Sequence, residues 1–150
     1  MAGNHRDVVE IRIPSRTEHL AIVNRVAEEL AEQLAMSEDD RDAVATSVIE
    51  AATNAIQHGN RNDATKTVTV RFVTTPGRLE VVVTDEGSGF DPSTVADPLQ
   101  PENLLRERGR GLFLIRAFMD DVVYSPSERG TVVHLVKRFR RTPARREAGR

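Results

Sequence analysis

The first third of the chain carries the apolar spacing of a strand followed by a helix. Residues 8–13 alternate apolar and polar positions, which predicts a strand that Pro14 ends. A helix follows to about Ala35, with Ser15 or Thr17 as its N-terminal cap. Its apolar residues recur at spacings of three and four, which is typical of one buried stripe. The stripe comprises Leu20, Val23, Ala27, Leu30 and Leu34.

A second helix is predicted from about Glu38 to His58. Ser37 precedes it as a cap, and Gly59 directly after it is a natural C-terminal stop. The inner side of this helix is made of small and branched apolar residues, namely Val44, Val48, Ala51, Ala52, Ala55 and Ile56. The next residues, 60–64, are polar and predict a loop.

The second half of the chain is rich in β-forming residues. Runs at 67–73 and 79–84 flank Pro76-Gly77, which favours a hairpin turn. The remaining elements are a helix at 112–119, strands at 121–124 and 131–137, and a turn at 125–130. This order predicts an α/β (α+β) two-layer sandwich, in which helices cover one face of a mixed, mostly antiparallel sheet.

Composition narrows the class of protein. A chain of 150 residues suits one domain, and the absence of cysteine excludes disulfides and thiolate metal sites. The N-terminus lacks an apolar signal core, and no apolar run approaches the roughly 20 residues that span a membrane. A cytoplasmic protein without membrane contact is therefore expected.

Charge is distributed unevenly along the chain. Residues 137–150 hold seven Lys or Arg and one acid, which gives this segment a net charge of +6. Because the whole chain has a formal net charge of −2, residues 1–136 carry a net charge of −8. An acidic body argues against nucleic acid as the main ligand. A basic end of this kind is more often solvated than bound to nucleic acid. We expect a globular domain over 1–138 and a basic, disordered tail over 139–150.

Candidate chemistry begins on the second predicted helix. Glu50, Asn54 and His58 stand four residues apart and therefore near one helix face. A carboxylate can accept a proton from a nucleophile, and an Asn oxygen suits Mg²⁺. A solvent-facing polar stripe is the alternative. We assign His58 a structural role and no chemistry.

A second motif, Asp85-Glu-Gly87-Ser-Gly89, directly follows a predicted strand. The Asp85 carboxylate can accept a hydrogen bond from an exocyclic amine such as that of adenine. Gly87 and Gly89 lack a β-carbon, so a flat ring can approach the backbone closely. An ordinary tight turn uses the same residue types and is the alternative.

A third motif opens the predicted helix at 112–119. The glycines of Gly109-Arg-Gly111 leave backbone N–H groups for phosphate, with Arg106, Arg108 and Arg110 as possible added charge. A flexible start to a helix is the alternative. The sequence contains neither a P-loop nor a dinucleotide-binding glycine pattern. The preceding stretch, 91–108, holds three prolines and favours a lid or binding loop.

Together the motifs resemble those of the superfamily of DNA gyrase B subunits, sensor histidine kinases and mismatch-repair ATPases. That superfamily has four conserved sequence motifs, called boxes, in a fixed order. Within residues 8–138 of this chain they correspond to the three motifs above, at 50–59, 85–90 and 109–115, and to a fourth, Gly130-Thr131. The first and third boxes look most like those of the anti-sigma factor serine kinases of bacterial partner switching. A chain that ends after one domain also fits this group. The resemblance implies a Bergerat-type ATP-binding fold.

The resemblance also implies roles for residues. Glu50 would be the general base toward a serine hydroxyl, and Asn54 would hold Mg²⁺ between the phosphates. Asp85, helped by Thr131, would bind the adenine amino group. The walls of the ATP site would be formed by Gly87 and Gly89 at adenine and by Arg108, Gly109, Gly111 and Leu112 at the phosphates. The lid would be 91–108.

The partners implied by the resemblance are a sigma factor and a STAS-type anti-sigma factor antagonist that is phosphorylated on serine. A homodimer is also implied. Two alternatives remain open at this point. One is an ATP-gated binding module that transfers no phosphate, and the other is slow ATP hydrolysis without a protein substrate, because related ATPases use a similar carboxylate to activate water.

Overall fold

The computed structural model describes residues 5–87 and 107–141, with only the backbone at 107–110 and 112. Within these residues, five strands form one sheet in the order β1-β2-β3-β5-β4, and every pair is antiparallel. The strands are β1 (Asp7–Pro14), β2 (Thr67–Thr75), β3 (Arg78–Asp85), β4 (Asp121–Ser127) and β5 (Gly130–Arg138). The predicted fold class is confirmed, although no parallel pair occurs among these strands.

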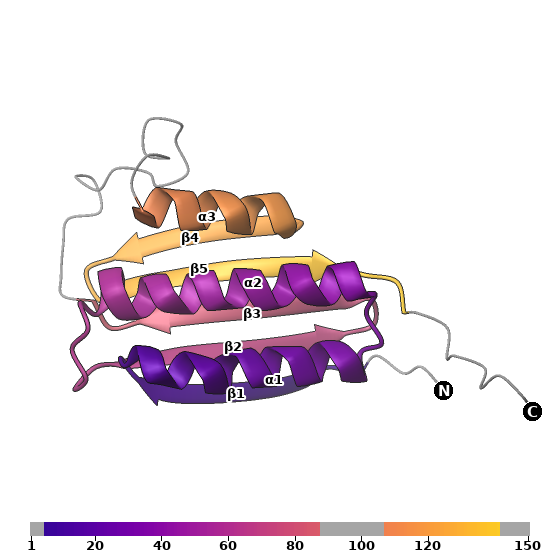
Figure 1. Ribbon diagram of the computed structural model, residues 1–150, viewed down its shortest axis with the longest axis horizontal. Helices are drawn as coiled ribbons and strands as arrows, with labels where there is room; N and C mark the ends of the chain where they lie inside the picture. Colours follow the sequence, from indigo (N-terminus) through magenta and orange to yellow (C-terminus); the bar gives the residue numbers. More distant parts are fainter. Residues whose placement is uncertain (1–4, 88–106, 142–150) are drawn as a thin grey trace, which may run out of the picture.

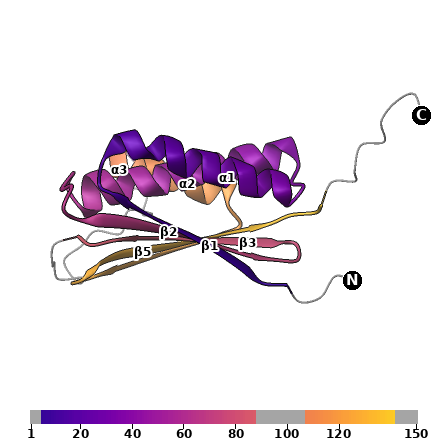
Figure 2. The same ribbon diagram turned by 90° about the horizontal axis from the view of Figure 1, so that it is seen from below.

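The helices lie together on one face of this sheet (Figure 1). They are the 3₁₀ turn η1 (Thr17–His19), α1 (Leu20–Gln33), α2 (Glu38–Asn54), the π-helical turn η2 (Ala55–Gly59) and α3 (Glu107–Phe118). Figure 2 shows that the described helices leave the opposite face of the sheet uncovered. The molecule is therefore the two-layer sandwich that the order of elements predicts. No helix in the described ranges is both long and apolar enough to cross a membrane.

The core lies between the helices and the covered face of the sheet. Its strand residues alternate, as Val68, Val70 and Phe72 of β2 show, because successive strand side chains point to opposite faces. The whole predicted inner side of the second helix is buried, with its last two residues, Ala55 and Ile56, on η2. On α1, Val23 and Ala27 are buried, while the three predicted leucines are partly buried and pack against the core.

Of the two predicted helix caps, one is confirmed and the other is wrong. The Ser37 hydroxyl accepts a hydrogen bond from the Asp40 N–H at 3.1 Å, so it caps α2 as predicted. Ser15 caps no helix, because its buried hydroxyl donates to the Lys66 carbonyl at 2.8 Å. Thr17 is the first residue of η1 instead of its cap. The Ser15 hydroxyl thereby ties the end of β1 to the start of β2.

Several element boundaries differ from prediction, and the predicted second helix ends as α2 at Asn54 and continues as η2 instead of running to His58 as one α-helix. The helix α3 begins at Glu107, so Gly109 and Gly111 lie inside its first turns instead of ahead of it. The strands β4 and β5 pair as far as Ser127 and Gly130, which leaves a tighter turn than predicted. The β2–β3 hairpin is confirmed, and Gly77 takes the positive φ of 72° that favours glycine at such a turn.

The link from η2 to β2 is held by its own polar side chains. Arg61 and Asn62 both have positive φ, at 53° and 59°, and reverse the chain there. Asp63 then accepts hydrogen bonds from the hydroxyl and the backbone N–H of Thr65. The hydroxyl bond lowers the pKa of the Asp63 carboxyl, since it favours the charged form.

Candidate nucleotide site

Several ends of elements meet at one end of the molecule. The C-terminal end of α2, the C-terminal end of β3 and the start of α3 all lie at the left of Figure 1. At this end α2 gives way to the π-helical turn η2, and such turns are frequent at functional sites. The antiparallel order of the strands also brings the start of β5 beside the end of β3. Described residues of the first three sequence motifs therefore lie around this point, together with Thr131 of the fourth motif.

Glu50 and Asn54 lie directly against the start of α3. A β-carbon added to Gly111 would lie 2.8 Å from Glu50 Oε2 and 3.4 Å from Asn54 Nδ2. The glycine therefore lets α3 approach the two polar side chains of α2 more closely than any other residue would. The contact brings residues of the first and third motifs together.

Asn54 holds an unsatisfied donor at this contact. Its Nδ2 atom is buried and finds no hydrogen-bond partner among the described residues. Buried polar atoms are nearly always paired, so an unpaired one is expected where a ligand completes the set. Because the oxygen and nitrogen of an amide are assigned from their surroundings, either end of Asn54 can face such a ligand.

Asp85 is buried at the end of β3 and only 5% exposed. Its Oδ1 atom accepts the backbone N–H of Gly87 at 2.9 Å and that of Thr131 at 3.0 Å. The two bonds hold the carboxylate in one orientation and join the second motif to the fourth. Thr131 is itself buried, and the contact to Asp85 that the structure shows is made by its backbone.

Three glycines surround the Asp85 residue with almost no space. A β-carbon on Gly59 would lie 2.1 Å from Asp85 Oδ2, and one on Gly130 would lie 2.1 Å from the Asp85 carbonyl oxygen. One on Gly87 would lie 2.8 Å from the carbonyl oxygen of Gly59. Gly130 also has a φ of 134°, which side chains rarely adopt. Sequence reasoning assigned Gly59 to a helix end and so missed its contact with Asp85.

Asn60 is a second residue that sequence reasoning missed. Its place in a polar stretch after a helix predicts an exposed loop residue, but Asn60 is only 1% exposed. It donates to Ser15 Oγ at 2.8 Å and to the Thr67 carbonyl at 2.9 Å, and it accepts the Glu86 N–H at 2.8 Å. The sequence signal was weak, because Asn after a helix-ending Gly is ordinary in a loop.

Several predicted site residues lie partly or wholly outside the described residues. Gly89 and residues 91–106 are outside them, and Arg108, Gly109 and Leu112 are placed only as backbone of α3. His58 lies on η2, in the half-buried range. No group of three His, Cys, Asp or Glu side chains gathers as a metal site within the described ranges.

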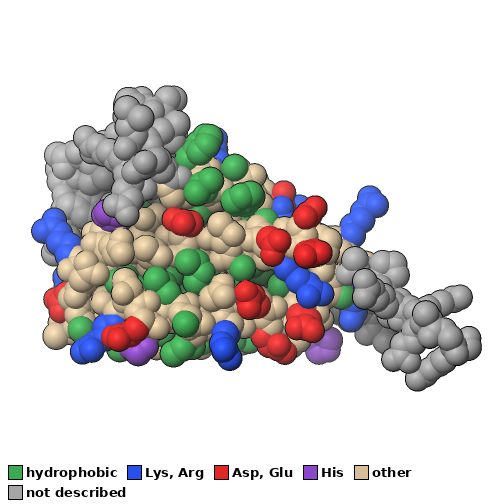
Figure 3. All heavy atoms as spheres, in the orientation of Figure 1, with side chains coloured by type: hydrophobic (Ala, Val, Ile, Leu, Met, Phe, Trp, Pro, Cys, Tyr) green, Lys and Arg blue, Asp and Glu red, His purple; other side chains and the backbone are tan. Residues whose placement is uncertain are grey.

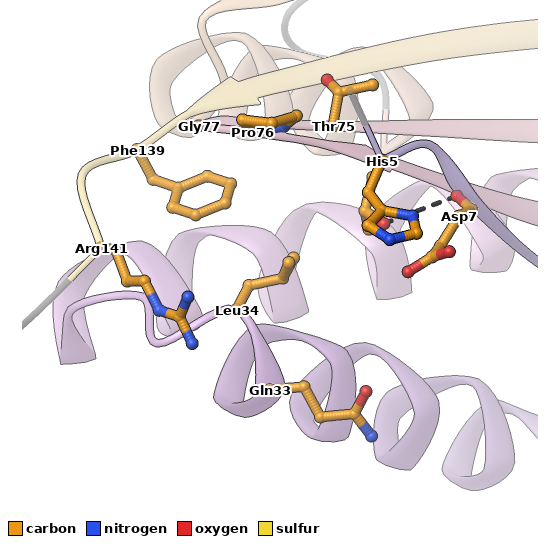
Figure 4. Close-up of a pocket in the computed structure, with 10 residues that line it drawn as sticks. His5, Asp7, Gln33, Leu34, Thr75, Pro76, Gly77, Phe139 and Arg141 are labelled. Carbon is orange, nitrogen blue, oxygen red and sulfur yellow. Dashed lines mark hydrogen bonds between the residues drawn. The ribbon is translucent and has the colours of Figure 1, made fainter. Parts of the chain in front are cut away.

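A cavity of about 380 Å³ lies away from these residues, beside the β2–β3 hairpin. It is lined by His5, Asp7, Gln33, Leu34, Thr74, Thr75, Pro76, Gly77, Phe139 and Arg141. In Figure 4 the Phe139 ring and Leu34 face its interior, while the His5 and Asp7 side chains lie together on one side. None of the predicted site residues lines it. Phe139 packs against the core, and its N–H donates to the Gly77 carbonyl.

Known proteins with similar sequences identify the family of this chain. The family model of the histidine kinase-like ATPase domain matches residues 13–137. Serine-protein kinase RsbW of Bacillus licheniformis is 35% identical over 122 residues, which cover 77% of this chain and 76% of that protein. RsbW of Staphylococcus epidermidis is 29% identical and covers 97% of this chain and 95% of that protein.

Solved structures share the fold. The structure of the RsbU and RsbW domains of Rv1364c from Mycobacterium tuberculosis has a TM-score of 0.68 at 18% identity. The match covers 93% of this chain and 34% of that longer one. The catalytic domain of histidine kinase ThkA has a TM-score of 0.55 at 14% identity, with 89% and 97% covered. The chain thus belongs to the histidine kinase-like ATPase family, and within that family to the RsbW serine-protein kinases.

Proposed function

We propose that this protein is an anti-sigma factor and an ATP-dependent serine kinase that phosphorylates an anti-sigma factor antagonist. The observation that carries the proposal is the close contact of Gly111 with Glu50 and Asn54. It brings a carboxylate, an amide and a glycine-bearing helix start into one place. The names of the RsbW relatives support the choice of a serine residue as the phosphate acceptor.

Asp85 supplies the adenine recognition in this proposal. Its Oδ1 atom is already held by two backbone N–H groups, so the carboxylate is preorganised. A carboxylate only accepts hydrogen bonds, and the exocyclic amine of adenine is a donor. A β-carbon on Gly87 would lie 3.1 Å from Asp85 Oδ1, so the glycine lets the chain pass close to the carboxylate. Gly89 remains a predicted part of this wall.

Asn54 fits the phosphate end and a magnesium ion. Its buried, unpaired amide nitrogen can donate to a phosphate oxygen, and its oxygen is a hard ligand suited to Mg²⁺. Magnesium, when bound, would neutralise charge on the phosphates. We assign Arg108, Gly109, Gly111 and Leu112 to the phosphate wall of the same site.

Glu50 is the general base in this proposal. Its side chain is half-buried, so a serine of a protein substrate can reach it. Glu50 accepts the proton of the serine hydroxyl while the serine oxygen forms a bond to the γ-phosphorus and the bond to the ADP oxygen breaks. Positioned proton transfer of this kind contributes about 10²- to 10⁴-fold to a rate.

The helix α3 offers an exposed apolar surface to protein partners. Phe113, Leu114 and Phe118 of α3 are 53%, 41% and 40% exposed. Figure 3 shows hydrophobic side chains gathered over α3. Exposed apolar patches often mark sites of protein association. We propose a sigma factor and a STAS-type antagonist as partners, a homodimer as the working unit, and the cytoplasm as the location.

The test is phosphate transfer from labelled ATP with Mg²⁺ to a purified STAS-type anti-sigma factor antagonist from the same organism. The variant is Glu50→Gln, which keeps the shape of the side chain and removes its basicity. Glu38→Gln is the matched control, because Glu38 is an exposed acid at the other end of the same helix. We expect label on one antagonist serine, transfer at least about 100-fold slower in Glu50→Gln, and wild-type transfer in Glu38→Gln.

Nucleotide affinity, measured on the same three proteins, separates the alternatives. Equal ATP affinity in all three would show that Glu50 acts in chemistry and not in binding. Tight ATP binding without transfer by the wild type would favour the ATP-gated binding module. Release of inorganic phosphate at the same rate with and without antagonist would favour simple ATP hydrolysis.

A further inference from the structure

The side chain of Asn60 stands between two strands where their ladder stops. The register of β2 and β3 ends with Val68 opposite Asp85, and the next residues in that register are Thr67 and Glu86. These two do not form a backbone rung. Instead, the Asn60 amide donates to the Thr67 carbonyl and accepts the Glu86 N–H. The side-chain amide thus occupies the place of one rung of the sheet.

The remaining groups at this point confirm the orientation of the amide. Its second N–H donates to Ser15 Oγ, whose own proton goes to the Lys66 carbonyl. The Thr67 N–H is taken by Glu86 Oε2 at 2.7 Å. A flipped Asn60 would set its NH₂ group against the Glu86 N–H, so only the observed orientation satisfies every donor.

We propose that Asn60 is the positioning residue for adenine recognition by Asp85, an inference that rests on the proposed function. By accepting the Glu86 N–H, Asn60 ends the pairing of β3 with β2 immediately after Asp85. The Gly87 N–H, one residue on, then reaches Asp85 Oδ1. Gly59, the residue before Asn60, lies against Asp85 Oδ2. Asn60 thus sets the position of Gly87 beside Oδ1, while its neighbour Gly59 lies against Oδ2.

The test measures how strongly the protein recognises the 6-amino group of adenine. The probes are ATP and the purine ribonucleoside triphosphate that lacks this group, each titrated with Mg²⁺ into the full chain. The ratio of the two dissociation constants reports on the contact with Asp85. Loss of one hydrogen bond that orients a buried group is expected to lower the ratio by about tenfold in Asn60→Ala.

Ser15→Ala is the matched control. It removes a bond to the same amide and destabilises the same junction, but it leaves the Glu86 N–H on Asn60. We expect it to lower the melting temperature and to keep the wild-type ratio. Equal losses of affinity for both probes in Asn60→Ala, or an unchanged ratio, would overturn the proposal, since either result would reduce Asn60 to a structural role.

Asn60→Asp covers the case in which Asn60→Ala does not fold. It keeps an acceptor for the Glu86 N–H and loses both donors, so it should retain the ratio despite lower stability. Loss of the ratio in this variant would count against the proposal. If the wild type binds ATP no more tightly than the probe without the amine, the assignment of adenine recognition to Asp85 is wrong. If the wild type prefers ATP and Asn60→Ala keeps the same ratio of dissociation constants, only the role of Asn60 is wrong.

Discussion

At the residue scale, the site depends on glycines as much as on polar side chains. Asp85 can be buried beside η2 only because Gly59 has no side chain, as an added β-carbon would overlap Oδ2 at 2.1 Å. The sequence motif pointed to Asp85 and Gly87, since glycines after an acid at a strand end suggest a site. It did not reveal Gly59 as a partner, because this contact joins residues 26 positions apart.

Gly59→Ala should therefore reduce ATP binding sharply. Displacement of the Asp85 carboxylate removes its hydrogen bond to the adenine amine, and a loss of about 1–3 kcal/mol corresponds to roughly a 5- to 150-fold loss of affinity. Isothermal titration with ATP and Mg²⁺ measures it. Gly77→Ala is the control, because it strains a glycine with φ of 72° at the far hairpin and should lower stability alone. Equal ATP affinity in Gly59→Ala and wild type would refute the steric argument.

At the element scale, the two ends of α2 have different roles, one in stability and one in the proposed site. Its N-terminus is closed by Ser37, a local signal that the sequence shows plainly. Its C-terminal end carries Glu50 and Asn54 and then widens into η2. The widening was not predictable from residue types, because Ala55 and Ile56 suit an ordinary α-helix and both are buried by tertiary contacts.

Ser37→Ala should lower the free energy of unfolding by about 1 kcal/mol through loss of the N-cap bond. ATP affinity should not change, since the cap lies at the opposite end of α2 from Asn54. Chemical denaturation and titration of the same sample check both statements. Thr46→Ala, an exposed substitution in the middle of α2, should be neutral or slightly stabilising. A change in ATP affinity in Ser37→Ala would mean that the two ends of the helix are coupled.

At the scale of the whole molecule, the site joins the helix layer to the sheet layer. Glu50 and Asn54 come from α2, Gly111 from α3, Asp85 from β3 and Thr131 from β5. A ligand that touches all of these binds the native state and not the unfolded chain. Binding should therefore stabilise the fold as a whole.

Saturating ATP with Mg²⁺ should raise the melting temperature measurably. At about 100 times the dissociation constant the stabilisation is about 2.7 kcal/mol, or roughly 5–10 °C for a domain of this size. Asp85→Asn should abolish the shift at the same ATP concentration, because an amide N–H would face the adenine amine. Differential scanning fluorimetry measures both proteins. An equal shift in Asp85→Asn would show that the nucleotide does not use this carboxylate.

The sequence by itself determined the elements, the layer order and the motif residues Glu50, Asn54, Asp85 and Gly111. Periodicity, caps and strand-end motifs are local, so they can be read along the chain. Only the tertiary structure decided that Ser15 ties strands instead of capping a helix, that Gly59 adjoins Asp85, and that Asn60 replaces a rung of the sheet. The Ser15–Lys66 contact joins residues 51 positions apart, and the Gly59–Asp85 and Asn60–Glu86 contacts join residues 26 apart, so local spacing encodes none of them.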